Sequence, residues 1–91
     1  MFILLMTSYA HASPAILVLG DSLSAGYGID PRRGWVQLLR ERLEQDGHDY
    51  RVLNASISGD TTRGGWERLP KALEQHQPAI LILELGANDG L

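Results

Sequence analysis

Three apolar runs divide the chain and predict the strands of a β-sheet. Residues 14–20 (PAILVLG) and 78–86 (PAILILELG) are apolar almost throughout, whereas residues 50–56 (YRVLNAS) are more polar. A strand that is buried on both faces shows no alternation of apolar and polar side chains, which is typical of parallel sheets covered by helices. The pattern therefore predicts three strands, of which the first is buried on both faces.

The segment between the first two runs has the spacing of an amphipathic helix. Trp35, Leu39 and Leu43 occupy positions i, i+4 and i+8 within residues 34–47, and charged side chains fill the outer face. This spacing places the apolar side chains on one side of a helix. Gly47 should end the helix, because glycine readily adopts the left-handed conformation that closes many helices.

A second helix is predicted between the second and third runs. Three apolar side chains at helical spacing form its stripe: Trp66, Leu69 and Leu73. Thr61 or Thr62 should cap its first turn, because a threonine hydroxyl accepts a hydrogen bond from a free N–H group at a helix start. Pro70 should kink or restart the helix, since proline has no N–H to donate.

The predicted elements alternate as strand, helix, strand, helix, strand. This order is the signature of parallel strands joined by right-handed crossovers, with helices packed on the sheet. We therefore expect an α/β fold. Glu84 is the single charge of the third run, and we expect it to be paired or to lie at the strand's edge. The alternative is that it is a catalytic acid.

Composition limits the chain to one domain without a nucleic-acid partner. The 91 residues carry a net charge of −3, and 44% of them are hydrophobic. Basic side chains are not in excess, so binding to a phosphate backbone is not expected. The sequence has no cysteine, so no disulfide can stabilise a small core.

The first residues have the layout of a secretory signal peptide. A short apolar core is followed by the small-residue pattern Ala10-His11-Ala12, although no Lys or Arg precedes the core. We expect residues 1–12 to be removed, residues 13–91 to form the mature chain, and the protein to be periplasmic or secreted. The run is too short to span a bilayer. The alternative is an N-terminal segment that is frayed or buried.

Small, polar, glycine-containing segments follow all three predicted strands. They are residues 20–24 (GDSLS), 56–62 (SISGDTT) and 86–89 (GAND). Ligands bind outside the carboxyl ends of the strands in open α/β sheets, and parallel strands bring these ends to one edge. We therefore expect the functional site where the three segments meet.

These segments contain the groups that acyl transfer requires. The reaction needs a hydroxyl, a base and hydrogen-bond donors for the oxyanion. Ser22 offers the hydroxyl, and the donors are the backbone N–H groups of Ser22 and Gly59 with the side-chain amide of Asn88. Glycine at position 59 would let the backbone approach a substrate closely. The alternatives are that Ser22 is a turn serine and that Asn88 caps a turn.

An aspartate in each segment raises a different possibility. Asp21, Asp60 and Asp89 are expected to accept backbone N–H bonds and fix their loops, or together to hold Mg²⁺ for phosphoester hydrolysis. A nucleotide-binding loop fits less well, because Gly26-Tyr27-Gly28 lacks the third glycine of that fingerprint.

The amino-acid sequences of the three segments resemble those of a known family. GDSLSAGYG, NASISGDTT and ELGANDGL are similar to the first three sequence blocks of the SGNH, or GDSL, hydrolases, in the exported bacterial thioesterase, lysophospholipase and arylesterase branch. The match runs from about Ala15 to Leu91. The resemblance implies Ser22 as nucleophile and Ser22, Gly59 and Asn88 as the oxyanion hole. It also implies hydrolysis of small acyl esters or thioesters through an acyl-enzyme, without a metal or other cofactor.

The same resemblance implies a flavodoxin-like three-layer sandwich, of which this chain would supply three strands and two helices. In the strand order 2-1-3-4-5 of that fold, residues 78–86 lie inside the sheet with a fourth strand beside them. The chain therefore reads as the amino-terminal portion of a longer enzyme. Tyr27, Ile29 and Trp35 would line an acyl pocket or belong to the core.

The family's catalytic Asp and His, three residues apart near the C-terminus, have no counterpart in this sequence. His11 lies in the expected leader, and His48 and His76 precede strands, at the opposite edge from Ser22. A strand of five or six residues is about 17–20 Å long, so neither can deprotonate Ser22. The 91 residues alone are expected to be feebly active, or to be a non-catalytic remnant that binds acyl ligands.

Overall fold

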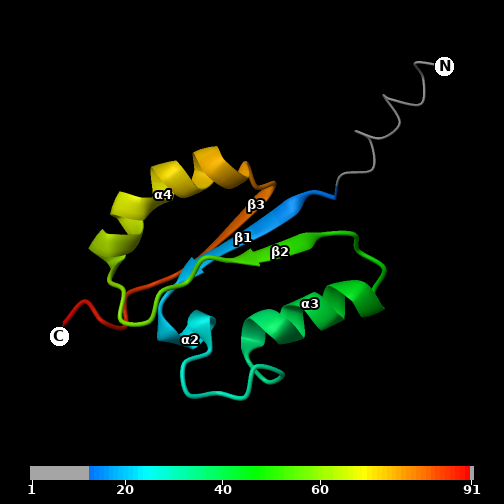
Figure 1. The fold of residues 1–91 in the computed structure, drawn as a ribbon, viewed down its shortest axis with the longest axis horizontal. Helices are drawn as coiled ribbons and strands as arrows, with labels where there is room; N and C mark the ends of the chain where they lie inside the picture. The colour runs from blue at the N-terminus through cyan, green and yellow to red at the C-terminus, as the bar shows by residue number, and fades with distance from the viewer. Residues whose placement is uncertain (1–12, 91) are drawn as a thin grey trace.

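The structure, a computed structural model, describes residues 13–90. The expected leader, including His11, lies outside the described residues. Three strands form one sheet: β1 is Ala15–Gly20, β2 is Arg51–Asn54 and β3 is Ile80–Glu84. The strand order is β2-β1-β3, and β1 pairs with both neighbours in parallel (Figure 1). The predicted parallel α/β sheet is confirmed.

Helices cover both faces of this sheet. α3 (Trp35–Gln45) lies on one face, where Ile16 and Val18 of β1 form a core cluster with Val36 and Val52. α4 (Thr62–His76) lies on the other face, where Gly65 meets Leu19 of β1. Successive strand residues point to opposite faces, which places the two helices on opposite sides, as Figure 1 shows. The predicted three-layer arrangement is therefore confirmed for these elements.

The apolar stripe and end of α3 agree with the sequence pattern. Trp35, Leu39 and Leu43 pack against the core cluster. Gly47 lies just after the helix and has a φ of 75°. The N–H of Gly47 donates to the carbonyl of Glu44, and the N–H of His48 donates to the carbonyl of Leu43. This double closure is a Schellman motif, and its left-handed residue is best supplied by glycine.

The start of α4 is capped as predicted, by Thr61, whose hydroxyl accepts a hydrogen bond from the N–H of Gly64 at 3.1 Å. Of the two predictions for Pro70, the restart is wrong, because one helix continues through it. The change in direction of the axis of α4 agrees with the predicted kink (Figure 1). The predicted stripe also needs correction, since Trp66 is 73% exposed. The buried residue is its neighbour Gly65, where a Cβ atom would lie 2.2 Å from the side chain of Leu85 and 3.1 Å from that of Leu19.

A one-turn helix that the sequence pattern did not predict follows β1. α2 (Ser22–Ala25) occupies part of the segment expected to be a loop. The carboxylate of Asp21 caps it by accepting a hydrogen bond from the N–H of Leu23 at 3.0 Å, and Gly26 ends it with a φ of 79°. The chain therefore turns sharply at the end of β1 instead of trailing away from the sheet.

β3 lies at the edge of the sheet that residues 13–90 form. Leu83 of β3 is 53% exposed, whereas every residue of β1 is buried. The fourth strand expected beside β3 stays a prediction. None of the helices in the described part of the chain is long and apolar enough to span a membrane.

Candidate active site

The three segments that follow the strands are tied together at the carboxyl edge of the sheet. The N–H of Ile57 donates to the carbonyl of Gly20 at 2.9 Å, which joins the second segment to the first. The side-chain amide of Asn88 donates to the carbonyl of Asp60 at 2.8 Å, which joins the third segment to the second. Parallel pairing therefore brings together three loops that are distant in sequence.

Ser22 stands at the first position of α2, and its side chain is partly exposed. The helix start leaves its N–H without an intrahelical acceptor. Within residues 13–90, neither this N–H nor the Ser22 hydroxyl makes a hydrogen bond. A donor and a hydroxyl therefore remain available to a ligand at the same residue.

Gly59 occupies a tight turn at the surface. The N–H of Asp60 bonds to the carbonyl of Ile57 at 3.1 Å, and Gly59 has a φ of 86°. A positive φ at this position of a turn is the reason for glycine, because other residues adopt it at a cost. The N–H of Gly59 also makes no hydrogen bond to the part of the chain that the structure describes.

Asn88 is tied to the Gly59 turn by a side-chain hydrogen bond. One hydrogen of its amide is used by the carbonyl of Asp60, and a carboxamide has a second to donate. No hydrogen bond among residues 13–90 joins Ser22 directly to Gly59 or Asn88. Their joint action on one substrate atom stays a prediction.

Asp60 and Arg68 form an ion pair beneath the second loop. Two guanidinium nitrogens of Arg68 donate to one carboxylate oxygen of Asp60 at 3.0 and 2.8 Å, and the third donates to the carbonyl of Ala55 at 2.9 Å. The side chains are only 27% and 12% exposed. Arg68 therefore holds both ends of the loop that contains Gly59. The sequence reasoning missed this residue, because an arginine at helical spacing resembles an ordinary surface charge.

Replacing Arg68 with alanine should destabilise the protein by about 1–3 kcal/mol, because the partly buried carboxylate of Asp60 and the carbonyl of Ala55 lose their partner. The matched control is Arg63→Ala on the same helix. Arg63 pairs with Glu67, but the side chains are 89% and 64% exposed, so the loss should stay below about 0.5 kcal/mol. Urea unfolding of both variants measures the difference, and equal losses would contradict the assigned role of Arg68.

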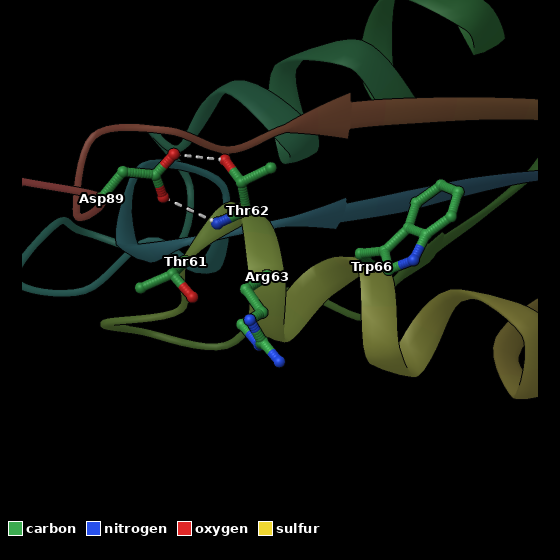
Figure 2. Close-up of a pocket in the computed structure, with 5 residues that line it drawn as sticks. All are labelled: Thr61, Thr62, Arg63, Trp66 and Asp89. Carbon is green, nitrogen blue, oxygen red and sulfur yellow. Dashed lines mark hydrogen bonds between the residues drawn. The ribbon is translucent and has the colours of Figure 1, made fainter.

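Asp89 links the third loop to the start of α4. Its two carboxylate oxygens accept hydrogen bonds from the N–H of Thr62 at 2.8 Å and from the Thr62 hydroxyl at 2.6 Å (Figure 2). These bonds, the hydroxyl bond first, lower the pKa of Asp89 below its ordinary value. Their stabilising effect is present above the ordinary pKa and is lost as the pH falls through the lowered one.

The three aspartates do not assemble into a cation site in this structure. Asp60 is paired with Arg68 and Asp89 with Thr62. Asp21 is fully buried, with one carboxylate oxygen on the N–H of Leu23 and the other without a partner. Across residues 13–90, no three acidic, His or Cys side chains come together to hold a metal ion.

Glu84 and Trp35 contact Ser24 in the turn that contains Ser22. Glu84 accepts a hydrogen bond from the Ser24 hydroxyl at 2.7 Å, and Ser24 accepts one from the indole N–H of Trp35 at 3.0 Å. Glu84 is thus hydrogen-bonded and lies at the end of β3, and among residues 13–90 it forms no ion pair with a cationic side chain. Trp35 belongs to the core, whereas Tyr27 and Ile29 are 77% and 44% exposed.

The two histidines among residues 13–90 lie away from this edge, as predicted. His48 lies between α3 and β2, and His76 is the last residue of α4, the helix that precedes β3. Both positions are at the amino ends of strands.

Beside the loops, a shallow hollow of about 510 Å³ is lined by Thr61, Thr62, Arg63, Trp66 and Asp89 (Figure 2).

Comparison with known proteins supplies independent information on these loops. Residues 18–91 match the model of the GDSL-like lipase/acylhydrolase family. The chain is 54% identical over 89 residues to "Esterase TesA" of Pseudomonas aeruginosa, covering 98% of this chain and 44% of that protein. It is 47% identical over 91 residues to "Thioesterase 1/protease 1/lysophospholipase L1" of Escherichia coli strain K12, covering 100% of this chain and 42% of that protein.

A solved structure agrees with the same assignment. The crystal structure of the psychrotrophic esterase EstA from Pseudoalteromonas sp., inhibited by monoethylphosphonate, superposes with a TM-score of 0.75 at 47% identity. The superposition covers 86% of this chain and 43% of that one. The chain thus spans less than half the length of each of these relatives.

Proposed function

Because the chain belongs to the GDSL-like lipase/acylhydrolase family, we propose that the whole protein hydrolyses carboxylic esters and thioesters of acyl groups, with Ser22 as nucleophile. The observation that supports this most is the set of unused donors at one edge of the sheet. The N–H groups of Ser22 and Gly59 have no acceptor within residues 13–90. The side-chain amide of Asn88 donates one hydrogen to the carbonyl of Asp60, and its second hydrogen is available to a ligand. Such donors stabilise charge that develops in a transition state.

In the proposed reaction, the Ser22 hydroxyl oxygen attacks the carbonyl carbon of the substrate, and a base takes the hydroxyl proton. The carbonyl oxygen becomes an oxyanion, which accepts hydrogen bonds from Ser22, Gly59 and Asn88. The alcohol or thiol then leaves with the proton, and an acyl-enzyme remains. Water attacks this intermediate and releases the acid.

The base comes from outside the described residues in this proposal. His48 and His76 lie at the amino ends of the strands, and a general base must come within about 2.6–3.2 Å of the proton it takes. We propose that a His, oriented by an Asp, supplies this function from a part of the protein that this sequence does not contain.

The names of the relatives support the substrate class. One is called an esterase, and the other is called a thioesterase and a lysophospholipase. Esters and thioesters share an acyl carbonyl and differ in the leaving atom, so one oxyanion hole serves both. The proposal is therefore stated for acyl groups rather than for one leaving group.

Turnover by the purified whole protein tests the proposal against the rival phosphoester hydrolase. We expect hydrolysis of p-nitrophenyl butyrate and of a butyryl thioester, with rates that EDTA leaves unchanged. Hydrolysis of bis(p-nitrophenyl) phosphate that EDTA abolishes and Mg²⁺ restores would instead support a metal held by Asp21, Asp60 and Asp89. Inertness toward all acyl substrates would contradict the proposal.

We also propose that the protein is exported. The support is the apolar core of residues 2–6 followed by Ala10-His11-Ala12. The protein recovered from outside the cytoplasm should begin at Ser13, which N-terminal sequencing measures. Recovery from the cytoplasm with residues 1–12 intact would contradict export.

A further inference from the structure

Glu84 lies beside the residue at which the turn that contains Ser22 begins. It is the last residue of β3, and it pairs in register with Gly20, the last residue of β1. Asp21 and Ser22 follow Gly20 directly. The end of one strand therefore carries a carboxylate beside the point where the neighbouring strand gives way to α2.

The contacts of Glu84 are with this turn. One carboxylate oxygen, Oε1, accepts the Ser24 hydroxyl at 2.7 Å and has a longer contact of 3.4 Å with the N–H of Asp21. At 3.4 Å the second contact lies beyond the usual range for an N–H···O bond. The bond to Ser24 is thus the main link between β3 and the turn.

The direction of this hydrogen-bond chain is fixed. The indole N–H of Trp35 can only donate, and it donates to the Ser24 hydroxyl oxygen at 3.0 Å. The single proton of that hydroxyl then points to Glu84. Ser24 is only 3% exposed, so a loss of the Glu84 acceptor would leave the proton of a buried hydroxyl without an acceptor, which is costly.

The hydrogen-bonded side chains of Ser24 and Glu84 pack closely against the backbone of Gly20. A Cβ atom at Gly20 would lie 2.7 Å from the Ser24 hydroxyl oxygen and 2.9 Å from Oε1 of Glu84. The carbonyl of Ser24 also accepts a hydrogen bond from the side chain of Asn54 at 2.8 Å. Ser24 is therefore held by β2, β3 and α3 together.

We propose that Glu84 is a positioning residue, which acts through Ser24 to hold the turn that presents the Ser22 hydroxyl. The Ser22 hydroxyl makes no hydrogen bond of its own to residues 13–90, so its place depends on the backbone of α2. The inference rests on the proposed function, because it concerns the reactivity of Ser22. Small displacements of a reacting group slow the chemical step without weakening substrate binding.

The test compares Glu84→Ala, Glu84→Gln and a control in the whole protein, with p-nitrophenyl butyrate as substrate. Glu84→Ala should lower kcat about 10- to 100-fold with little change in KM. Glu84→Gln keeps an acceptor oxygen for Ser24 and should retain activity within about threefold of wild type. The control is Glu74→Ala, an exposed glutamate of α4, which should match wild type.

A spectroscopic readout distinguishes positioning from general loss of stability. In ¹H–¹⁵N spectra, the indole N–H signal of Trp35, assigned by its loss in Trp35→Phe, should shift in Glu84→Ala. The signal of Trp66, which is 73% exposed, should stay in place.

Three outcomes would overturn the positioning role. One is wild-type kcat in Glu84→Ala, and another is an equal loss in Glu84→Gln and Glu84→Ala. A Trp35 signal that does not move is the third. If wild-type protein hydrolyses the ester and any of these three outcomes is observed, the positioning role of Glu84 is wrong and the proposed esterase function stands. Wild-type protein that is inert toward the ester removes both proposals.

Discussion

Replacing Ser22 with alanine should abolish ester hydrolysis, lowering kcat by a factor of about 10⁴ or more in the whole protein. The reason is that the Ser22 hydroxyl oxygen is the group that attacks the carbonyl carbon in the proposed reaction. The fold should be unaffected, because the Ser22 hydroxyl makes no hydrogen bond to residues 13–90. Steady-state kinetics with p-nitrophenyl butyrate and a thermal unfolding scan measure the two effects.

The matched control for this variant is Ser13→Ala. Among residues 13–90, the hydroxyl of Ser13 bonds to the exposed carboxylate of Asp49, at the amino end of β1 and away from the loops. It should keep wild-type kinetics. Substantial activity in Ser22→Ala, with the enzyme shown to be free of contaminating esterase, would remove Ser22 from the role of nucleophile.

Replacing Asn88 with alanine should lower kcat about 10²- to 10³-fold, the effect typical of losing one oxyanion donor. The donor acts only when the oxyanion forms, so kcat and kcat/KM should fall by the same factor while KM stays unchanged. Some stability should also be lost, because Asn88 bonds to the carbonyl of Asp60. Kinetics are therefore measured well below the unfolding temperature.

Gln75→Ala is the control for removal of a carboxamide. Gln75 lies exposed on α4, and its loss should leave kcat and KM as in wild type. A rise in KM with kcat unchanged in Asn88→Ala would mean that the amide binds ground state and transition state equally. That result would exclude Asn88 from the oxyanion hole.

Much of the fold follows from local patterns in the sequence. The unbroken apolar run of β1 predicted a strand buried on both faces, and every residue of Ala15–Gly20 is buried. Parallel topology then placed the three polar segments at one edge, where hydrogen bonds such as that from Asn88 to Asp60 join them. Both inferences need only the period of hydrophobicity and the order of the elements.

Other features escaped because the sequence signal is short or absent. α2 has four residues, too few for a helical period, so a stretch with small residues resembled a loop. Periodicity also placed Trp66 in the packed stripe of α4. The helix instead meets the sheet through Gly65, which lies close to the side chains of Leu85 and Leu19 because it has no Cβ atom, and glycine has no hydrophobic signal.

The polar contacts that support the candidate site were the hardest to predict. Ser24 and Glu84 are 60 positions apart in sequence, and nothing in their local pattern indicates a partner. The pairing of Arg68 with Asp60 also depends on how α4 is turned against the second loop. Such contacts arise from tertiary packing, so they require the structure.

The most direct test of the account is a crystal structure of the whole protein after reaction with a fluorophosphonate. We expect the phosphorus atom to be bonded to the Ser22 hydroxyl oxygen. Its phosphoryl oxygen should lie about 2.7–3.1 Å from the backbone nitrogens of Ser22 and Gly59 and from the side-chain nitrogen of Asn88. An adduct on another residue, or a phosphoryl oxygen beyond the reach of these three nitrogens, would contradict the central claim.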